Sequence, residues 1–406
     1  MYFSRTFVVA ATALASFGRV LAVPLESAAV EVRQDGEVAL PDIDPSMNPV
    51  DALQELQSAV EEAMSHENCK RGPKKCTLAT ARVRKDWAVL TKRERKDYIK
   101  AAQCLRSLPS KGPEEWSAAQ TRYDDFVALH VNLTMSVHGS GLFLTWHRAF
   151  VWSYETALRD ECGYKGTQPY WNWFADAEDL TKSPVFDGSD TSLGGDGEFV
   201  QHNGSLGGAR HIYLPSGAGG GCIKSGPFKN ASASIGPFNP AMDGLGPVVL
   251  DLSDYNPRCI QRDLNSYAMG KWYTTANLLN VTIGAASRTH RAFWSEVQGR
   301  YPDQFLGLHT TGHYSINGDN TDLYSSPNDP AFFLHHAMFD RLYWMHQILH
   351  PAEAREVAGT LTLQDRPPSR NATVDDVLDM GTLGESHPIK DMFDTLGGDP
   401  LCYIYL

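Results

Sequence analysis

The sequence predicts a mainly α-helical protein with long irregular loops and little β structure. Five stretches place apolar residues at the spacing of one helix face. One long region between them is rich in glycine, serine, proline and asparagine, which is typical of loops. The chain has 406 residues, 42% of them hydrophobic, which suits one large domain with extensions.

The first three helical stretches lie in the first half of the chain. Residues 79–105 put Val83, Trp87, Leu90 and Tyr98 near helical spacing with charges on the other face, which predicts an amphipathic helix. A second helix is predicted over 123–132. A third covers 143–161 and ends before Gly163. It is aromatic on nearly every side, so we expect it to be buried.

Helical periodicity returns in residues 287–300 and 330–350, where Pro330 suits a first-turn position. The loop region begins at about residue 176 and is richest in glycine up to residue 253; the predicted insert runs to about residue 285. Loops of this length in a compact domain are usually functional or disordered. We interpret this insert as a rim around a site within one domain of residues 46–406.

The N-terminus has the pattern of an export signal. Arg5 precedes an apolar stretch that ends in small residues, and Val20–Ala22 resembles a cleavage site, so residues 1–22 are predicted to be a signal peptide. A buried N-terminal helix is the weaker alternative because Arg19 and Pro24 interrupt it. Residues 23–45 are acidic and poor in aromatic residues, as expected of a mobile pro-segment.

Glycosylation sequons and cysteines agree with secretion. Seven cysteines lie in no Cys-x-x-Cys pair, which favours disulfides, and an odd one must remain over. The sequence does not determine their pairing, although a Cys222–Cys259 bond would cross-link the part of the chain with the least regular structure. Candidate N-glycosylation sites are Asn132, Asn203, Asn230, Asn280 and Asn371.

The overall charge of −12 and the absence of a basic block argue against nucleic acid as a partner. No apolar run after residue 22 approaches the ~20 residues that a membrane span needs. Membrane insertion is therefore not expected.

Half of the fourteen histidines fall in two short parts of the chain. His130, His138 and His147 form one group, and His309, His313, His335 and His336 form the other. His309 and His313 are four residues apart, so on a helix both rings lie on one face. Gly139 and Gly141 suggest that His138 belongs to a loop. The remaining histidines are expected to have ordinary structural roles: His66, His202, His211, His290, His346, His350 and His387.

A single histidine on an aromatic helix is usually a core residue bonded to a carbonyl oxygen. That interpretation fails for the whole set, because each buried imidazole would need a partner, whereas a shared metal supplies one to all of them. Ligation by imidazole alone suits copper, zinc or iron. A mononuclear zinc site would leave one group unexplained, so two groups of three predict two ions that face each other.

Both groups lie in motifs that resemble the type-3 copper proteins, that is, tyrosinases, catechol oxidases and hemocyanins. The first is His130, His138 and FLTWHRAF with His147, followed by PYWNW; the second is HTTGH followed by NDPAFFLHHAMFDRLYW. The resemblance runs from about residue 80 to the C-terminus and leaves the glycine-rich region unmatched. It implies a four-helix bundle that houses two copper ions, with dioxygen as co-substrate.

The resemblance also implies the ligands. Copper A would be held by His130, His138 and His147, and copper B by His309, His313 and one of His335 and His336. The family pattern favours His336, whereas helix geometry alone does not choose, because adjacent residues point about 100° apart. With His336 as the ligand, Asp340 lies one turn further along and would brace a ligating ring or the helix. Phe332 lies one turn back, where the family places a phenylalanine over copper A; plain core packing is the alternative.

The chain departs from the family at two places. Many members have a cysteine bonded to the second copper A ligand, but here that position is Ser136, so the cross-link is expected to be absent. Members that hydroxylate monophenols often hold a water between a glutamate and an asparagine that follows the first copper B ligand. Here Thr310 follows His309, and Asp303 and Gln304 are the nearest polar residues upstream.

The resemblance predicts a secreted phenol oxidase that uses dioxygen to oxidise o-diphenols to o-quinones, with o-aminophenols as further substrates and weak hydroxylation of monophenols. Alternatives are a hemocyanin-like oxygen carrier, a full tyrosinase, and a zinc or iron hydrolase. Small phenols and dioxygen are the expected partners, and a homodimer is left open. Tyr403 and Tyr405 are expected to dock on a helix that carries Arg82 and Arg84, with no C-terminal lid domain.

Overall fold

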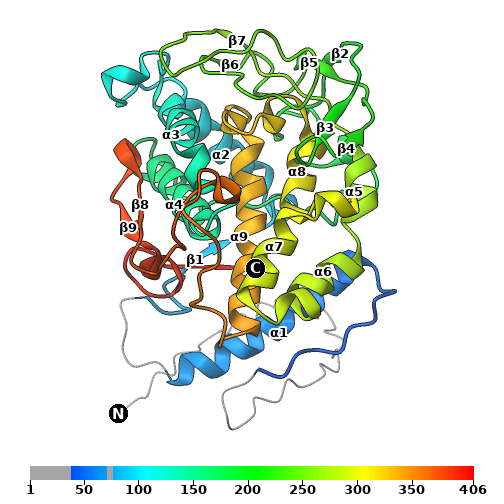
Figure 1. Cartoon of the computed structure of the whole chain (residues 1–406), viewed down its shortest axis with the longest axis vertical. Helices are drawn as coiled ribbons and strands as arrows, with labels where there is room; N and C mark the ends of the chain where they lie inside the picture. Colours follow the sequence, from blue (N-terminus) through cyan, green and yellow to red (C-terminus); the bar gives the residue numbers. More distant parts are fainter. Residues whose placement is uncertain (1–37, 71–75) are drawn as a thin grey trace, which may run out of the picture.

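The computed structural model describes residues 38–70 and 76–406. The predicted signal peptide, most of the predicted pro-segment, and the side chains of residues 66–70, which include His66 and Cys69, lie outside the description. Helices form the body of the described chain (Figure 1). The short strands between residues 197 and 259 lie with their loops along one end of it, and those between residues 377 and 388 lie at one edge. The predicted mainly helical fold with little β structure is confirmed.

Two long helices form the centre of the molecule. α4 (Phe143–Asp160) and α9 (Ala331–Leu349) pack against each other, as Figure 1 shows. Almost every residue of α9 is buried, because a helix that is apolar all round is stable only when it is covered on every side. The predicted helices at 143–161 and 330–350 are thus confirmed to within two residues, with Pro330 directly before α9.

Two further helices complete the frame of the site. α3 (Arg122–Val137) begins with a capping box in which Thr121 and Asp124 bond each other's backbone N–H groups. It runs five residues beyond its predicted end. α8 (Leu308–Ile316) packs against α9, and α3 packs against α4.

The prediction of one amphipathic helix over 79–105 is wrong in its first half. Residues Arg82–Arg84 form a strand, β1, and Trp87–Val89 form a single 3₁₀ turn; helix α2 covers only Lys92–Leu105. β1 pairs in parallel with β10 (Tyr403–Tyr405) at the far end of the chain. A pairing partner more than 300 residues away overrides the local pattern.

The expected docking of the C-terminal tyrosines is confirmed, although Arg82 and Arg84 lie on a strand and not on a helix. The buried Arg84 guanidinium donates to the Tyr405 hydroxyl at 2.8 Å, and its Nε and Nη2 atoms donate to the Glu155 carboxylate of α4 at 2.9 and 2.8 Å. The hydroxyls of Tyr403 and Tyr405 each donate to Asp340 at 2.6 Å.

Helices also appear where loops were expected. Within the predicted insert of 176–285, α5 (Ser266–Trp272) and α6 (Thr275–Thr282) form the final part. α7 (His290–Gln298) is shorter at each end than the predicted 287–300. α1 (Pro49–Lys70), for which the sequence pattern gave no expectation, packs against α6 and α9.

The glycine-rich region forms irregular chain with three small antiparallel pairs of strands. They are β2 (Gly197–Phe199) with β5 (Gly220–Ile223), β3 (Ser205–Gly207) with β4 (Ile212–Leu214), and β6 (Ser232–Ala233) with β7 (Arg258–Cys259). Near the C-terminus β8 (Val377–Leu378) pairs with β9 (His387–Pro388).

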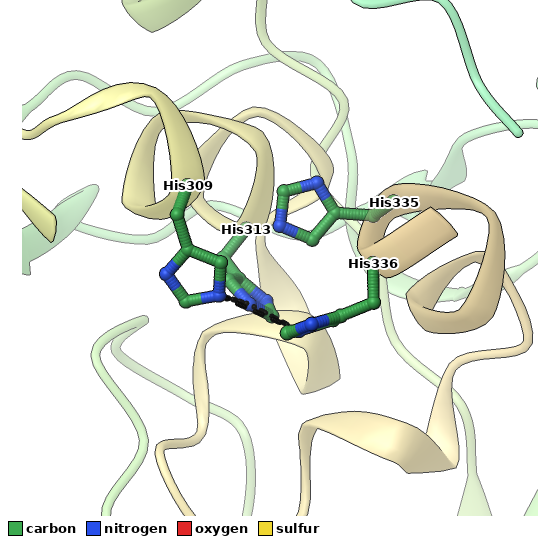
Figure 2. Close-up of side chains that lie close together, drawn as sticks. All are labelled: His309, His313, His335 and His336. Carbon is green, nitrogen blue, oxygen red and sulfur yellow. Dashed lines mark hydrogen bonds between the residues drawn. The ribbon is translucent and has the colours of Figure 1, made fainter. Parts of the chain in front are cut away.

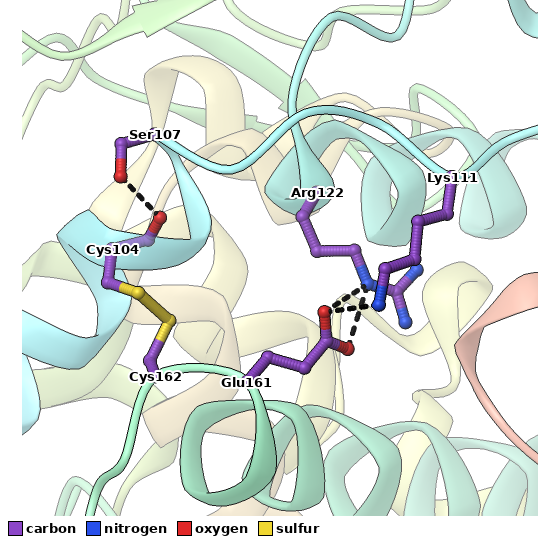
Figure 3. The surroundings of a disulfide bond; sticks show 6 residues. All are labelled: Cys104, Ser107, Lys111, Arg122, Glu161 and Cys162. Atoms are coloured by element: carbon purple, nitrogen blue, oxygen red, sulfur yellow. Dashed lines mark hydrogen bonds and ion pairs between the residues drawn. A yellow bond between two sulfur atoms is a disulfide. The ribbon is translucent and has the colours of Figure 1, made fainter.

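Three disulfides link distant segments: Cys76–Cys402, Cys104–Cys162 and Cys222–Cys259. The last is the pair suggested by the sequence. Cys104 near the end of α2 is joined to Cys162 just beyond α4, and the neighbouring Glu161 accepts from both Lys111 and Arg122 (Figure 3). The disulfide and these bonds fasten α2, α3 and α4 together.

Among the described residues, no helix combines the length and apolarity needed to span a lipid bilayer.

Candidate dinuclear metal centre

The first histidine group comes together at the junction of α3 and α4. His130 lies in α3, His138 caps the end of α3, and His147 lies one turn into α4. The three are buried, and their ligand-capable nitrogens lie within 4.8 Å of one another. The expectation that His138 lies outside the helix is confirmed by its extended backbone, with φ −116° and ψ 144°.

Main-chain carbonyls fix the orientation of these three rings. Nδ1 of His130 lies 2.5 Å from the main-chain oxygen of Tyr324. Nδ1 of His138 lies 3.0 Å from that of Thr134, and Nδ1 of His147 lies 2.8 Å from that of Phe143. A carbonyl only accepts, so each Nδ1 carries the proton and each Nε2 offers a lone pair. The Nε2 atoms of His130 and His147 are buried without a partner among the described residues. Orphaned acceptors that converge in this way fit a metal ion.

The second group comes from α8 and α9. The Nε2 atoms of His309 and His313 are 3.1 Å apart, those of His313 and His336 are 3.2 Å apart, and those of His309 and His336 are 3.4 Å apart (Figure 2). Nδ1 of His313 lies 2.9 Å from the Asn320 carbonyl oxygen, so the Nε2 atom of His313 offers a lone pair toward the other two rings. This triad therefore also fits a metal ion.

The structure distinguishes His336 from its neighbour. Figure 2 shows the His335 ring to one side of the contacts that join His309, His313 and His336. His335 instead stacks on His309 and lies against Trp173, with ring centroids 5.4 and 5.0 Å apart. Gly312 leaves the space that His335 occupies, because a Cβ there would lie 2.3 Å from the ring. The His335 ring thus packs beside the three close Nε2 atoms, although all four imidazoles lie close enough to share an ion and both His335 ring nitrogens lack a hydrogen-bond partner among the described residues.

The two triads face each other across a short gap. The rings of His147 and His336 stack at 4.5 Å with an interplanar angle of 14°. Phe332 is fully buried, stacks on His336 at 4.1 Å, and meets His130 edge-on at 5.3 Å. It is not among the residues that line the pocket described below. It thus packs between an imidazole of the first triad and one of the second.

Burial keeps these imidazoles neutral. It lowers the pKa of His138 and of His313 to about 4, although a carbonyl bond to each ring opposes the shift. Burial and then the neighbouring imidazoles lower the pKa of His147 and His336 well below the ordinary value. Neutral histidine is the form that binds metal, so the centre is ready to bind at neutral pH without losing protons.

A pocket of about 1120 Å³ opens onto the triads. His138, His309 and His313 line it, together with Phe143 at the start of α4. Loops of the glycine-rich region form its rim, as predicted, with residues 203–210 and 239–246 among them. A pocket of this size admits a small aromatic molecule.

Asp340 supports a helix and touches no imidazole. Its carboxylate accepts from Arg148 of α4 at 2.6 Å, from Arg84 of β1 at 3.3 Å, and from the two C-terminal tyrosines. Of the two roles that its position predicted, bracing the helix is the one that these contacts match.

The polar residues near His309 in the sequence do not form the water-holding pair that some family members have. Thr310 lines the pocket, but its hydroxyl donates to the Gln298 carbonyl at 3.2 Å. Gln304 is exposed, donates to the His211 carbonyl, and is not among the pocket-lining residues, so its assignment to the site is wrong. Glu296 of α7 accepts hydrogen bonds from Arg300 and Asn280 and is not among the pocket-lining residues.

The other sequence candidates lie apart from the triads. Asn132, Asn203, Asn230 and Asn371 are exposed, whereas Asn280 is half-buried with its amide bonded to Glu296. His346 and His350 donate to main-chain carbonyls at 3.0 and 2.7 Å, as expected of structural histidines. Asn320, which contacts His313, was not predicted from the sequence, because the only feature that points to it there is its position seven residues after His313.

Fold and site together define a helical protein in which two adjacent groups of buried histidines could each hold a metal ion. Residues 120–349 match the common central domain of tyrosinase. The chain is 37% identical to tyrosinase P of Aspergillus terreus over 334 residues, which cover 80% of this chain and 91% of that protein. It is 38% identical to the N-acetyl-6-hydroxytryptophan oxidase of Emericella nidulans over 353 residues, 81% of this chain and 93% of the relative.

A solved structure agrees with these relatives. A mutant of polyphenol oxidase from Thermothelomyces thermophila superposes with a TM-score of 0.78 and 35% sequence identity, covering 88% of this chain and 98% of the other. The chain belongs to the tyrosinase family of type-3 copper proteins, which carry a dinuclear copper centre.

Asn320 offers a test of how the second triad is held. Its side-chain Oδ1 and main-chain oxygen lie 2.7 and 2.9 Å from Nδ1 of His313. Replacing it with leucine should weaken binding of one copper ion about tenfold, the lower end of the usual effect of losing a ligand's hydrogen-bond partner, because the main-chain acceptor remains. Copper titration of the metal-free protein against a chelator measures this. Asn239→Leu, in the same pocket but with no hydrogen bond to a described histidine, should leave both affinities unchanged.

Proposed function

We propose that this chain is a secreted phenol oxidase that uses dioxygen to oxidise o-diphenols, with o-aminophenols as a second substrate class. The observation that carries the proposal is the pair of facing triads at the base of an open pocket. His130, His138 and His147 would hold one copper, and His309, His313 and His336 the other. The histidine-bearing helices α3, α4, α8 and α9 would form the bundle around them, and one chain supplies the whole centre.

When bound, the copper pair supplies the two-electron reduction of dioxygen. The protein's own residues hold six neutral imidazoles in fixed orientations and exclude water from their buried sides. The pocket admits the phenol. Its open volume favours an oxidase over a hemocyanin-like carrier, from which substrate must be excluded.

Two carboxylates line the pocket, those of Asp243 and Asp322, and each already accepts hydrogen bonds from described residues. The carboxylate of Asp322 accepts four backbone N–H bonds, from Phe238, Asn239, Tyr324 and Ser325. The Thr310 hydroxyl cannot act as a base at neutral pH. A diphenol is more acidic and more easily oxidised, so it depends less on such a group. This supports o-diphenol oxidation with weak monophenol hydroxylation.

A full tyrosinase is the second candidate. Relatives bear that name, and the Emericella oxidase is named for a ring with one hydroxyl group.

Export is supported by three disulfides and by four exposed sequons, which are common in secreted proteins.

Matched substrate pairs test the proposal. Turnover of 4-methylcatechol should exceed that of 4-methylphenol by about 100-fold, the lower end of what a positioned acid or base contributes. Thr310→Asn should raise the monophenol rate selectively, because an amide at this position can hold a water. Thr310→Val, which loses the hydroxyl without adding an amide, serves as the control. Comparable monophenol and diphenol rates without a lag, after removal of diphenol traces, would contradict the proposal and favour a full tyrosinase.

A further inference from the structure

An unusual turn lies at the rim of the pocket. It connects β3 to β4 and contains Gly208, Ala209 and Arg210 in succession, with φ angles of 55°, 54° and 70°. Glycine adopts such angles freely, but alanine and arginine rarely do. Left-handed non-glycine residues persist where the surrounding structure holds them, and they cluster at functional sites.

The turn is held by close contact with the wall of the pocket. A Cβ on Gly207 would lie 3.1 Å from the Tyr314 ring, and one on Gly208 would lie 2.7 Å from the Tyr301 ring. Tyr314 directly follows His313 on α8, and both tyrosines line the pocket. The backbone that carries Arg210 thus rests against the helix that supplies two imidazoles, and Arg210 itself lines the pocket.

Arg210 is the uncompensated cation of this pocket. Four charged residues line it: Arg210, Asp243, Arg300 and Asp322. Arg300 is paired with Glu296 at 2.8 Å and with Asp303 at 2.7 Å, and Asp322 is satisfied by backbone N–H groups. Arg210 forms no ion pair or hydrogen bond with any residue that the structure describes.

The remaining anion, Asp243, is placed differently. It accepts a hydrogen bond from the Asn203 amide at 3.0 Å, whereas Arg210, which is exposed as Asp243 is, forms none with the described residues. A Cβ added to the following Gly244 would meet no atom within 4 Å, so this side of the rim stands in open space. The backbone that carries Asp243 is therefore held less closely by its surroundings than the backbone that carries Arg210.

We propose that Arg210 is a specificity-determining residue that binds a carboxylate on the side chain of the phenolic substrate. The proposal rests on the phenol oxidase function and names its substrate class as phenols with an anionic tail. Arginine is suited to bidentate recognition of a carboxylate. With a net charge of −12 the protein repels anions at long range, so a local cation is needed to retain one at the pocket.

Three catechols that differ in charge test the proposal in the copper-loaded protein. They are neutral 4-methylcatechol, anionic 3-(3,4-dihydroxyphenyl)propanoate and cationic dopamine. Arg210→Gln should raise KM for the anionic catechol about five- to tenfold with kcat unchanged, the effect of one charge-assisted bond reduced by exposure to solvent. KM for 4-methylcatechol should stay constant. Arg210→Glu should shift the preference toward dopamine, and Arg291→Gln, an exposed arginine outside the pocket, should change nothing.

Binding without turnover separates this proposal from the phenol oxidase function. The affinity for 3-phenylpropanoate, measured by calorimetry, should fall about five- to tenfold in Arg210→Gln and remain unchanged in Arg291→Gln. The same fall in affinity is expected even if the protein oxidises no phenol. That second result would overturn the proposed phenol oxidase function but not the role of Arg210 in binding a carboxylate. Equal losses on all three catechols would indicate a structural role and overturn the proposal, as would an unchanged affinity for 3-phenylpropanoate.

Discussion

Replacing His147 or His313 with alanine should remove one copper ion and abolish phenol oxidation. The unaltered protein should hold two coppers per chain and give no electron paramagnetic resonance signal, because neighbouring cupric ions couple. Each variant should retain one copper and show the signal of an isolated cupric ion. The loss of activity should exceed the ~100-fold that follows when only a ligand's hydrogen-bond partner is removed.

Metal analysis, resonance spectra and oxygen uptake on one preparation check this together. His211→Ala is a matched control, since that imidazole is exposed and does not line the pocket. Protons displace copper only where they can protonate an imidazole ligand. The pKa of His138 and of His313 is about 4, so protonation begins well below neutral pH. Copper should therefore be retained as pH falls through about 6 and be released toward about pH 4. One copper per unaltered chain, or zinc in its place, would contradict the assignment.

The histidine groups could be predicted from the sequence because their evidence is local. His309 and His313 share a helix face at four-residue spacing, and the surrounding motifs resemble a known family. The choice between His335 and His336 is not local. It depends on how α9 is rotated against α8, which the spacing of residues does not give. In the folded chain the Nε2 atoms of His309, His313 and His336 lie within 3.4 Å of one another, and this favours His336.

The errors share a physical cause. Arg82–Arg84 became a strand because Tyr403–Tyr405 pairs with it, and this pairing lies outside any local pattern. Gln304 is near His309 in sequence, but the turn at Tyr301–Asp303 leaves it on the surface. Asn320 reaches His313 because the chain turns back after α8, at Asn317 with φ 57°. Contacts that depend on loop direction were accessible only from the folded structure.

The largest expected effect on stability comes from Asp340. Its carboxylate faces two fully buried guanidiniums, those of Arg84 and Arg148, and accepts from two buried tyrosines. In Asp340→Asn the guanidinium of Arg84 still pairs with Glu155, but that of Arg148 loses its only ion pair among the described residues. Leaving a buried charge unpaired should lower the free energy of unfolding by about 3–5 kcal/mol. Asp375→Asn, which breaks an exposed pair with Lys390, should cost less than about 1 kcal/mol.

The pH dependence and the copper content identify the cause of that loss. Burial alone would raise the pKa of Asp340, but Arg148 and Arg84 hold it below the ordinary value. A carboxylate whose pKa is lowered by folding contributes stability above its unfolded pKa of about 3.9, and this contribution is lost as pH falls toward the folded value. The difference between Asp340→Asn and the unaltered protein, from denaturant titration with the disulfides intact, should thus be full at about pH 7 and shrink below about pH 4. Because Asp340 contacts no imidazole, the variant should still bind two coppers at neutral pH. Loss of one copper at unchanged stability would mean that Asp340 holds a ligating ring and not the helix.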